Sequence, residues 1–431
     1  MSSTVHAKTP LSDIHLFDPA TLIDPWDAYD VLREEAPVFF VPEMNLHVVT
    51  RYDLLMQAIR DTDTYSSDFG EFLNTARMVA FNAAPPNVQQ ELMKAAEKML
   101  PPVNTLLTAD LPTHRKYRSL VDRLFTVSNV RKMEPYIQQI IDDTMAGFLD
   151  TDGPVDFMQA FAFPVPLRII ADRLGVPEAD RAFFDDGATV AASGLRLTVP
   201  DHDEMVRRAK VMVALQDFMV DLVEQRRKDP KDDMATILGD VILEDEQRPL
   251  NAAEVWSIMN QFLVAGHETT TSTFGWGMLK LCQHPEFQGE LRDDPTLIKT
   301  FVEEALRTEA PVQGLPRLVK KDTDLGGYKL KAGDMIMLRY GAANRDAEKF
   351  ECPHQVDVHR KNAGAQLAFG SGIHHCPGAP LARQELNLGF PALLDKMQNI
   401  RLASGKPEPQ AEPSFILRNL PELWIEFDRR P

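Results

Sequence analysis

Residues 369–378 read Phe-Gly-Ser-Gly-Ile-His-His-Cys-Pro-Gly, and this stretch decides how the rest of the 431-residue chain is interpreted. Its cysteine, Cys376, lies in a turn rich in glycine, and an apolar run able to form a helix begins directly after it. Glycines such as Gly370 and Gly378 allow a backbone to fold tightly around a sulfur atom and to present N–H groups to it. A thiolate binds iron strongly, so the stretch indicates either a metal ligand or a structural cysteine in a loop.

The spacing of Phe369, Gly372, Cys376 and Gly378 resembles the haem-ligand signature of the cytochrome P-450 superfamily. The resemblance spans residues 24–427 and implies that Cys376 is the axial ligand of a haem b iron, with Phe369, Gly370 and Gly378 around the cofactor. It also implies a mainly α fold with small β-sheets, a single domain over residues 1–431, and a haem between a long central helix and the cysteine loop. A thiolate ligand pushes electron density onto the iron, which favours O–O cleavage.

Bulk composition excludes several other classes of protein. The chain is 44% hydrophobic and 26% charged, which is ordinary for a globular protein with a substantial core. A net charge of −18 argues against non-specific nucleic-acid binding. Three cysteines cannot build a disulfide framework, which fits the cytoplasm, and we expect Cys282 and Cys352 to be packing residues. No apolar run is long enough for a membrane anchor, and we expect a flexible segment at residues 1–20.

Local patterns predict the following elements. We expect helices at 24–35, 52–59, 87–100, 130–174 and 202–228, strands at 38–41, 46–50, 318–319 and 335–338, and a β-hairpin at 414–427. The segment 62–110 gives mixed signals, and in the resembled family this region covers the substrate pocket. We interpret the loop within 187–201 as a lid over that pocket.

His114 and Arg118 are one helical turn apart, so they share one face of a predicted helix. Taken alone, such a pair indicates a solvated basic face. The resemblance instead implies that His114 and Arg118 meet the haem propionates, together with Arg317 and His374. Buried carboxylates require cationic partners of this kind.

A long helix is predicted from Asn251, whose spacing to Glu254 is that of a capping box, to about Cys282. Within it, residues 265–270 read Ala-Gly-His-Glu-Thr-Thr, which is poor helix chemistry and predicts a kink or a π-bulge. Threonines bonded to carbonyls in a bent core helix are the alternative interpretation. We expect His267 to point outward or to play a structural role.

The same stretch resembles the oxygen-binding motif of the family, with Ala265 and Gly266 beside the haem, Glu268 as its acid and Thr269 as its alcohol. Reduction of dioxygen consumes protons, and a carboxylate beside a hydroxyl can relay them through water. The resemblance therefore implies that Glu268 and Thr269 are the catalytic pair.

Glu304 and Arg307 lie one turn apart on another predicted helix. They resemble the Glu-x-x-Arg motif of the family, and Arg360 is the best match to the arginine that joins it. An exposed pair of this spacing contributes little, whereas removing one partner of a buried network costs several kcal/mol. We assign the three residues to holding the haem loop in place.

The substrate pocket is the least determined part of the interpretation. Its candidate walls are Leu263, Val264, Val312, Gln313, Phe415 and Ile416. Ordinary strand core is an equally good interpretation of Phe415 and Ile416. Such walls favour an apolar guest, and Arg77, Arg196 or Gln313 would hold a polar end.

The resemblance implies a monooxygenase that activates dioxygen and hydroxylates, O-dealkylates or epoxidises an apolar small molecule such as a terpenoid, steroid, fatty acid or aromatic. Two electrons would come from a ferredoxin or flavodoxin with its NAD(P)H reductase, docked near Arg115, Lys116 and Arg123. One alternative is a peroxide-driven enzyme of the same fold, and another is a non-catalytic haem-binding or sensor protein. The pairing of Glu268 with Thr269 argues against both, because neither needs a proton relay.

Overall fold

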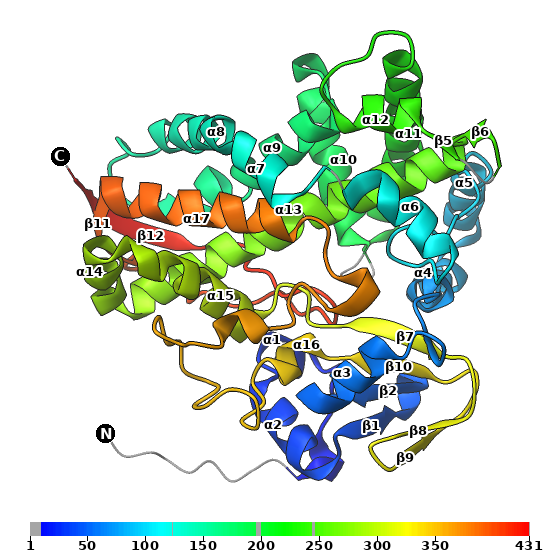
Figure 1. Ribbon diagram of the computed structural model, residues 1–431, viewed down its shortest axis with the longest axis horizontal. Helices are drawn as coiled ribbons and strands as arrows, with labels where there is room; N and C mark the ends of the chain where they lie inside the picture. The colour runs from blue at the N-terminus through cyan, green and yellow to red at the C-terminus, as the bar shows by residue number, and fades with distance from the viewer. Residues whose placement is uncertain (1–9, 123, 195–199, 244–245, 431) are drawn as a thin grey trace.

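The computed structural model describes residues 10–430, except for 123, 195–199 and 244–245, and leaves out the side chains of 71, 73 and 75–77. Figure 1 shows a large helical part, with one long helix, α13, running through it, above a smaller part built on a β-sheet. The main hydrophobic core surrounds α13 in the helical part, and two smaller cores pack on the sheet. The chain is therefore mainly α with small sheets, as the sequence predicts.

The α-helices have the following bounds: α1 Pro19–Ile23, α2 Trp26–Glu35, α3 Tyr52–Arg60, α4 Gly70–Ala83, α5 Pro86–Ala96, α6 Thr113–Asp122, α7 Val127–Lys132, α8 Glu134–Ala146, α9 Pro164–Leu174, α10 Arg181–Ser193, α11 His202–Arg226, α12 Met234–Asp240, α13 Ala252–Gln283, α14 Pro285–Asp293, α15 Ile298–Glu309, α16 Tyr340–Ala343 and α17 Ala379–Lys396. The strands are β1 Val38–Val41, β2 Leu46–Val49, β3 Tyr65–Ser66, β4 Val155–Asp156, β5 Ile242–Leu243, β6 Arg248–Pro249, β7 Leu315–Val319, β8 Thr323–Leu325, β9 Tyr328–Leu330, β10 Met335–Leu338, β11 Met397–Leu402 and β12 Trp424–Arg429.

The larger sheet brings together segments that are far apart in the sequence. Its strand order is β1-β2-β10-β7-β3, with β10 parallel to β2 and antiparallel to β7. The predicted hairpin of β1 and β2 is confirmed, with Val38 opposite Val49. Because β7 pairs with β10, Arg317 is fixed opposite Ile336 in the centre of this sheet.

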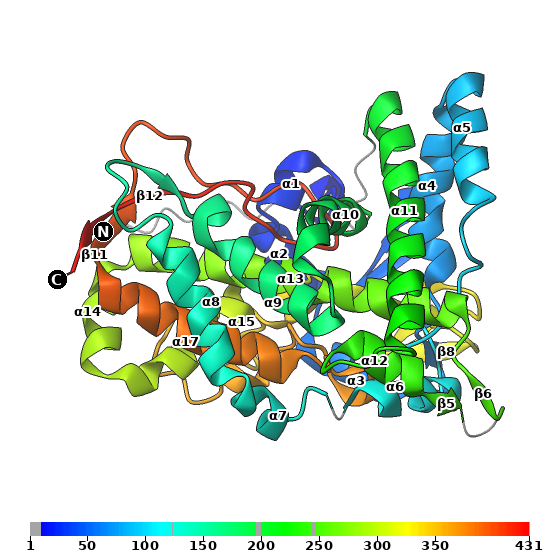
Figure 2. The ribbon, with the colours of Figure 1, turned by 90° about the horizontal axis from the view of Figure 1, so that it is seen from above.

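The helix α13 spans 32 residues and starts at a complete capping box. The Asn251 side chain accepts from the Glu254 N–H at 2.9 Å, and the Glu254 carboxylate accepts from the Asn251 N–H at 2.8 Å. Glu254 also binds Arg248 and Tyr117, so the start of the helix is tied to α6 and β6. Helices α9, α11, α15 and α17 pack along α13, and Figure 2 shows α11 and α5 projecting together from one end of the molecule.

Several local predictions are wrong. Residues 10–20 are not a flexible segment, because Ile14 and Leu16 are buried in the core beneath the sheet, and residues 1–9 lie outside the described part. The segment 62–110 contains the helix α4 as well as the predicted α5. Of the predicted lid, residues 195–199 lie outside the described residues.

The C-terminal hairpin at 414–427 is also wrong, since β12 pairs with β11 and β4 instead. The stretch before it is a loop, and among its contacts with the rest of the fold is a β-bridge between Leu417 and Val312. Strand propensity identified β12, but the partner strand lies across a long connection that local pattern does not reveal.

Candidate functional site

Two glycines with positive φ and a backbone hydrogen bond within the loop hold the Cys376 loop in a tight turn. Gly370 and Gly372 have φ of +63° and +69°, a region that other residues rarely adopt. The N–H of Cys376 donates to the carbonyl of Phe369 at 2.9 Å, and α17 begins three residues later. Gly378 has an ordinary φ of −81°, so its backbone does not require glycine as the predicted tight turn implied.

The Cys376 thiol is enclosed by protein on most sides. Burial raises the pKa of the thiol, while the backbone N–H groups of Gly378 and Ala379 and the charge of Arg118 oppose that shift. Pro377 has no N–H to donate. Backbone donors aimed at sulfur support a thiolate, which is the form that binds metals.

The middle of α13 has one accessible face. Ala265 is exposed and Thr269 is half-buried, although their neighbours His267, Glu268 and Thr270 are buried. The two accessible residues are one helical turn apart, so they lie on the same stripe. In the part of the chain that the structure describes, this stripe is an accessible strip on a helix whose other faces are buried here.

The predicted π-bulge in α13 is absent, because residues 252–283 form one continuous α-helix. Its threonines bond back to carbonyls four residues earlier, Thr269 to Ala265 at 3.1 Å and Thr273 to Thr269 at 2.8 Å. A π-helical turn occurs instead at Met158–Ala162, beside α9.

Gly266 faces α9 rather than the accessible stripe. A Cβ added to it would lie 2.6 Å from Cγ1 of Ile170, so glycine is needed here for the close approach of the two helices. Its predicted contact with the cofactor stays a prediction.

Glu268 points to the loop between β11 and β12. Its carboxylate accepts a hydrogen bond from the side-chain amide of Asn419, and both residues are buried. His267, predicted to point outward or to play a structural role, does not point outward: it is fully buried, with its Nδ1 3.0 Å from the carbonyl of Leu263 and its Nε2 3.5 Å from Glu268. Nothing in the sequence around Asn419 signals this contact, so the residue was missed.

His114 and His374 lie far apart in the sequence but are in contact in the fold. Their ring centroids are 4.2 Å apart, and the Nε2 atom of each is buried without a hydrogen-bond partner among the described residues. Burial and Arg118 lower the pKa of His114, and burial, Arg317 and His114 lower the pKa of His374 to about 3. Nδ1 of His374 lies 3.2 Å from the carbonyl of Leu106.

Arg317 and Arg118 lie near these rings. Arg317 is buried in β7, where it donates to the carbonyl of Pro316 at 2.7 Å and interacts with the hydroxyl of Tyr340. Arg118 forms an ion pair with Asp122 on its own helix. The four predicted propionate contacts therefore converge from three distant segments of the chain.

Glu304, Arg307 and Arg360 meet in a buried ion network. Glu304 is 2.5 Å from Nε of Arg307 and 3.0 Å from Nε of Arg360, and Glu304 and Arg307 have no exposed surface. Arg307 also donates to the carbonyls of Asn344, Pro353 and Gln355, at 2.6–3.0 Å. The network thus fixes the segment that precedes the cysteine loop.

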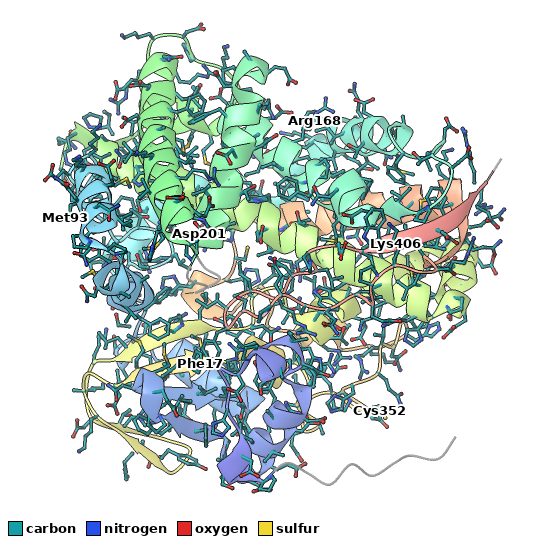
Figure 3. The ribbon with its side chains drawn as sticks, turned by 180° about the vertical axis from the view of Figure 1, so that it is seen from behind. Phe17, Met93, Arg168, Asp201, Cys352 and Lys406 are labelled. Atoms are coloured by element: carbon teal, nitrogen blue, oxygen red, sulfur yellow. The ribbon has the colours of Figure 1, made fainter. Side chains whose placement is uncertain are left out.

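The predicted pocket walls divide into two groups. Val264 and Val312 are half-buried, and Val312 is bridged to the C-terminal loop. Leu263 and Ile416 are buried in the protein interior, and Phe415 packs on Phe17 with ring centroids 4.4 Å apart. Phe17 lies in the N-terminal part of the molecule (Figure 3), so Phe415 belongs to that core.

Polar groups predicted around the pocket take other roles. The amide nitrogen of Gln313 donates to the carbonyls of Glu309 and Ala310 at 2.6 and 2.8 Å, and its predicted contact with a substrate stays a prediction. The side chains of Arg77, Arg123 and Arg196 lie outside the described residues. Lys116 is paired with Glu246, whereas Arg115 is exposed.

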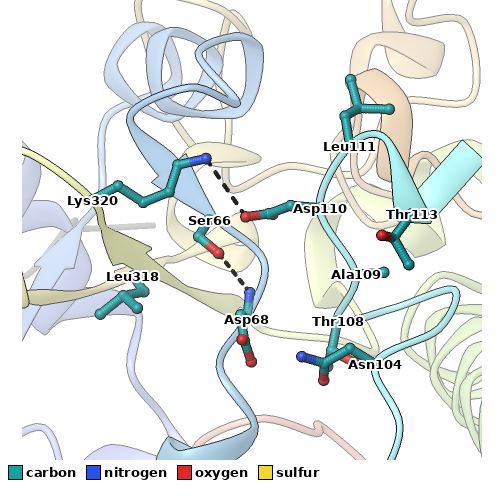
Figure 4. Close-up of a pocket in the computed structure, with 10 residues that line it drawn as sticks. All are labelled: Ser66, Asp68, Asn104, Thr108, Ala109, Asp110, Leu111, Thr113, Leu318 and Lys320. Atoms are coloured by element: carbon teal, nitrogen blue, oxygen red, sulfur yellow. Dashed lines mark hydrogen bonds and ion pairs between the residues drawn. The ribbon is translucent and has the colours of Figure 1, made fainter.

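A cavity of about 410 Å³ lies beside the start of α6, next to the segment that leads to His114. Figure 4 shows Lys320 reaching Asp110, with a distance of 3.6 Å between Nζ and the carboxylate. The lining is largely polar, with Ser66, Asp68 and Asn104 among its residues. It is therefore distinct in character from the predicted apolar pocket.

Two further findings concern cysteines and membranes. Cys282 is largely buried, with a pKa raised to about 12 by burial, but Cys352 is exposed on a surface loop and is not a packing residue (Figure 3). None of the helices in the described ranges combines the length and the apolar character that crossing a bilayer requires.

Comparisons with known proteins agree with this geometry. A family model described as Cytochrome P450 matches residues 193–425. The vitamin D(3) 25-hydroxylase of Pseudonocardia autotrophica is 34% identical over 418 residues, 96% of each chain. The 6-deoxyerythronolide B hydroxylase of Saccharopolyspora erythraea is 31% identical over 94% of this chain and 96% of that protein. The crystal structure of CYP109E1 from Bacillus megaterium with testosterone has a TM-score of 0.78 and 28% identity, covering 93% of this chain and 99% of that one.

Proposed function

This chain belongs to the cytochrome P450 family, and from that premise we propose that Cys376 is the axial ligand of its haem iron. The chain is a haem b monooxygenase, an oxidoreductase that acts on small molecules with electrons from an external redox partner. Phe369, Gly370 and Gly378 would surround the cofactor on the side of the sulfur. The backbone donors of Gly378 and Ala379 support the charged form of that ligand.

The observation that carries the proposal is the pair of buried Nε2 atoms on His114 and His374. Both atoms lie beside Arg317 and Arg118, and a ring that carries protons on both nitrogens would donate from Nε2 to a carboxylate bound there, which would also satisfy these buried polar atoms. Haem carries two carboxylates, and this set of residues fits them. We therefore assign His114, Arg118, Arg317 and His374 to the propionates.

Opposite the cysteine loop, we assign Ala265 to the face of α13 that borders the haem, and Thr269 and Glu268 to proton delivery. When bound, haem b supplies the iron at which dioxygen is activated. The Thr269 hydroxyl lies on the accessible stripe, where it can bind water or hold a proton. Glu268 is the adjacent acid, and its buried carboxylate can replace the proton that Thr269 passes on.

We propose that the substrate is a bulky apolar molecule of the steroid or macrolide type. A relative is named for vitamin D3, another for 6-deoxyerythronolide B, and a similar structure contains testosterone. Val264 and Val312 offer half-buried apolar surface for such a guest.

The electron donor would be a ferredoxin or flavodoxin with its NAD(P)H reductase, and exposed Arg115 is a docking candidate for an acidic partner. All three cysteines are free, which fits a reducing compartment such as the cytoplasm. We propose that the whole chain acts as one domain.

A titration of the ferric protein with testosterone and vitamin D3, followed in the Soret band, tests the proposal. We expect a low- to high-spin shift with at least one probe, and loss of the thiolate-type spectrum in Cys376→Ser. The matched control is Cys352→Ser, which alters an exposed cysteine and should leave the spectrum unchanged. A thiolate spectrum that survives in Cys376→Ser would contradict the assignment.

A further inference from the structure

The side-chain amide of Asn419 donates a hydrogen bond to the carboxylate of Glu268. The two side chains come from positions 151 residues apart and meet in the interior, with 8% and 5% of their surfaces exposed. Oε1 of Glu268 is bound by the Asn419 amide, while Oε2 faces Nε2 of His267 at 3.5 Å. Asn419 and His267 therefore approach different oxygens of the carboxylate.

His267 contributes a fixed orientation to this arrangement. Its Nδ1 faces the carbonyl of Leu263 at 3.0 Å, so Nδ1 carries a proton and donates it to that carbonyl. The ring also packs edge-on against Phe163, with centroids 5.7 Å apart. The Glu268 carboxylate therefore lies between the His267 ring and the Asn419 amide.

The loop that carries Asn419 is held rigidly against α13. The neighbouring carbonyl, that of Arg418, accepts from Ser272 at 2.5 Å and from the Trp276 indole at 3.0 Å. The Arg418 guanidinium is 3.0 Å from the buried carboxylate of Glu309. Asn419 therefore reaches Glu268 from a fixed point and not from a mobile loop.

We propose that Asn419 is a positioning residue, which holds the Glu268 carboxylate in the orientation from which it supplies protons to Thr269. This inference rests on the proposed role of Glu268. It assigns a function to the loop between β11 and β12, beyond the contacts that fasten this loop to Val312, Ser272 and Glu309.

The test compares Asn419→Ala and Asn419→Asp with Glu268→Gln, each measured as holoenzyme with a ferredoxin and its reductase. NADH oxidation and hydrogen peroxide release are followed with and without testosterone as the probe. We expect either Asn419 variant to slow NADH oxidation about tenfold, as for the loss of one hydrogen bond to a charged group, and to enlarge its solvent isotope effect. Asn419→Asp should have the larger effect, because it also places a second carboxyl against Glu268.

A double-mutant comparison separates positioning from a general loss of structure. In the Glu268→Gln background, Asn419→Ala should cause no further slowing, because the group that it positions is already neutral. The infrared carboxylate bands that disappear in Glu268→Gln should shift in Asn419→Ala, a readout that does not depend on turnover. The matched control is Asn362→Ala, which removes another asparagine side chain that donates to a distant group, in this case the carbonyl of Lys349 on the surface. It should change neither NADH oxidation nor the infrared carboxylate bands.

The outcomes are distinguishable. If Glu268→Gln leaves NADH oxidation unchanged, the proposed role of Glu268 fails. If Glu268→Gln slows NADH oxidation but both Asn419 variants match the wild type, the positioning role of Asn419 is overturned. It is also overturned if the Asn419 variants slow NADH oxidation as much in the Glu268→Gln background as they do in the wild type. Asn419→Asp, which is nearly isosteric, keeps the test decisive if Asn419→Ala is unstable.

Discussion

Two buried carboxylates on the same helix, Glu304 and Glu309 of α15, organise two different parts of the molecule. Glu304 binds Arg307 of its own helix and Arg360, and its second oxygen accepts from the N–H of Asp357 at 2.9 Å. It holds the segment before the cysteine loop. Glu309 holds the C-terminal loop that carries Asn419.

The partners of Glu309 come from three separate segments. Lys280 lies 2.6 Å away at the end of α13, Arg418 3.0 Å away and Arg345 3.6 Å away. The Arg418 and Arg345 guanidinium groups also stack on Trp26. The Glu304 network has one partner on the same helix, so its spacing can be recognised in the sequence. The Glu309 network is equally buried, but all of its partners are distant in the sequence, so no local motif predicts it.

Breaking the first network should have the largest effect. Glu304→Gln leaves the guanidinium groups of Arg307 and Arg360 buried without an anion, which costs about 3–5 kcal/mol. Urea unfolding should show this loss of stability, together with weaker retention of haem. A change below about 1 kcal/mol would contradict the structural role of the network.

Breaking the second network should cost somewhat less and should depend on pH. Burial alone raises the pKa of Glu309, but Lys280, Arg418 and Arg345 lower it to about 2. A carboxylate with a pKa lowered from 4.5 to about 2 contributes about 3 kcal/mol of stability above pH 4.5, and that contribution disappears as the pH falls toward 2. The difference in free energy of unfolding between the wild type and Glu309→Gln should therefore shrink over this range.

Glu303 on the same helix sharpens the comparison, because its ion pair is only partly buried. It is 2.5 Å from Nε of Arg383, whose side chain is 32% exposed, and Gln366 donates to it at 3.0 Å. Glu303→Gln should cost about 1 kcal/mol, since solvent screens the pair. A loss as large as that of Glu304→Gln would show that burial is not what separates the two.

The smallest effect is expected at an exposed pair away from α15. Lys331 lies 2.7 Å from Asp322 on the surface near β9. Asp322→Asn should leave the thermal unfolding midpoint unchanged within error, because solvent screens both charges. A measurable decrease in that midpoint would show that this exposed pair stabilises the fold in the way that the partly buried Glu303–Arg383 pair does.

The sequence predicts a structural feature correctly where all of the residues that form the feature lie in one short segment. The cysteine loop, the capping box at Asn251 and the spacing of Glu304 and Arg307 each depend on residues a few positions apart. The wrong predictions share the opposite property. The π-bulge in α13 did not form, and Gly266 instead allows close packing on Ile170, while His267 is buried against the ring of Phe163.

Sequence patterns alone were therefore enough to identify the family, the cysteine loop, the long helix and the Glu304–Arg307 pair on α15. Only the tertiary structure decided that His114 meets His374, that Gln313 is occupied by backbone carbonyls, and that Asn419 holds Glu268. The physical reason is range: helix periodicity and capping are set within a few residues, whereas the partner of a buried polar group is whichever distant segment the fold packs against it.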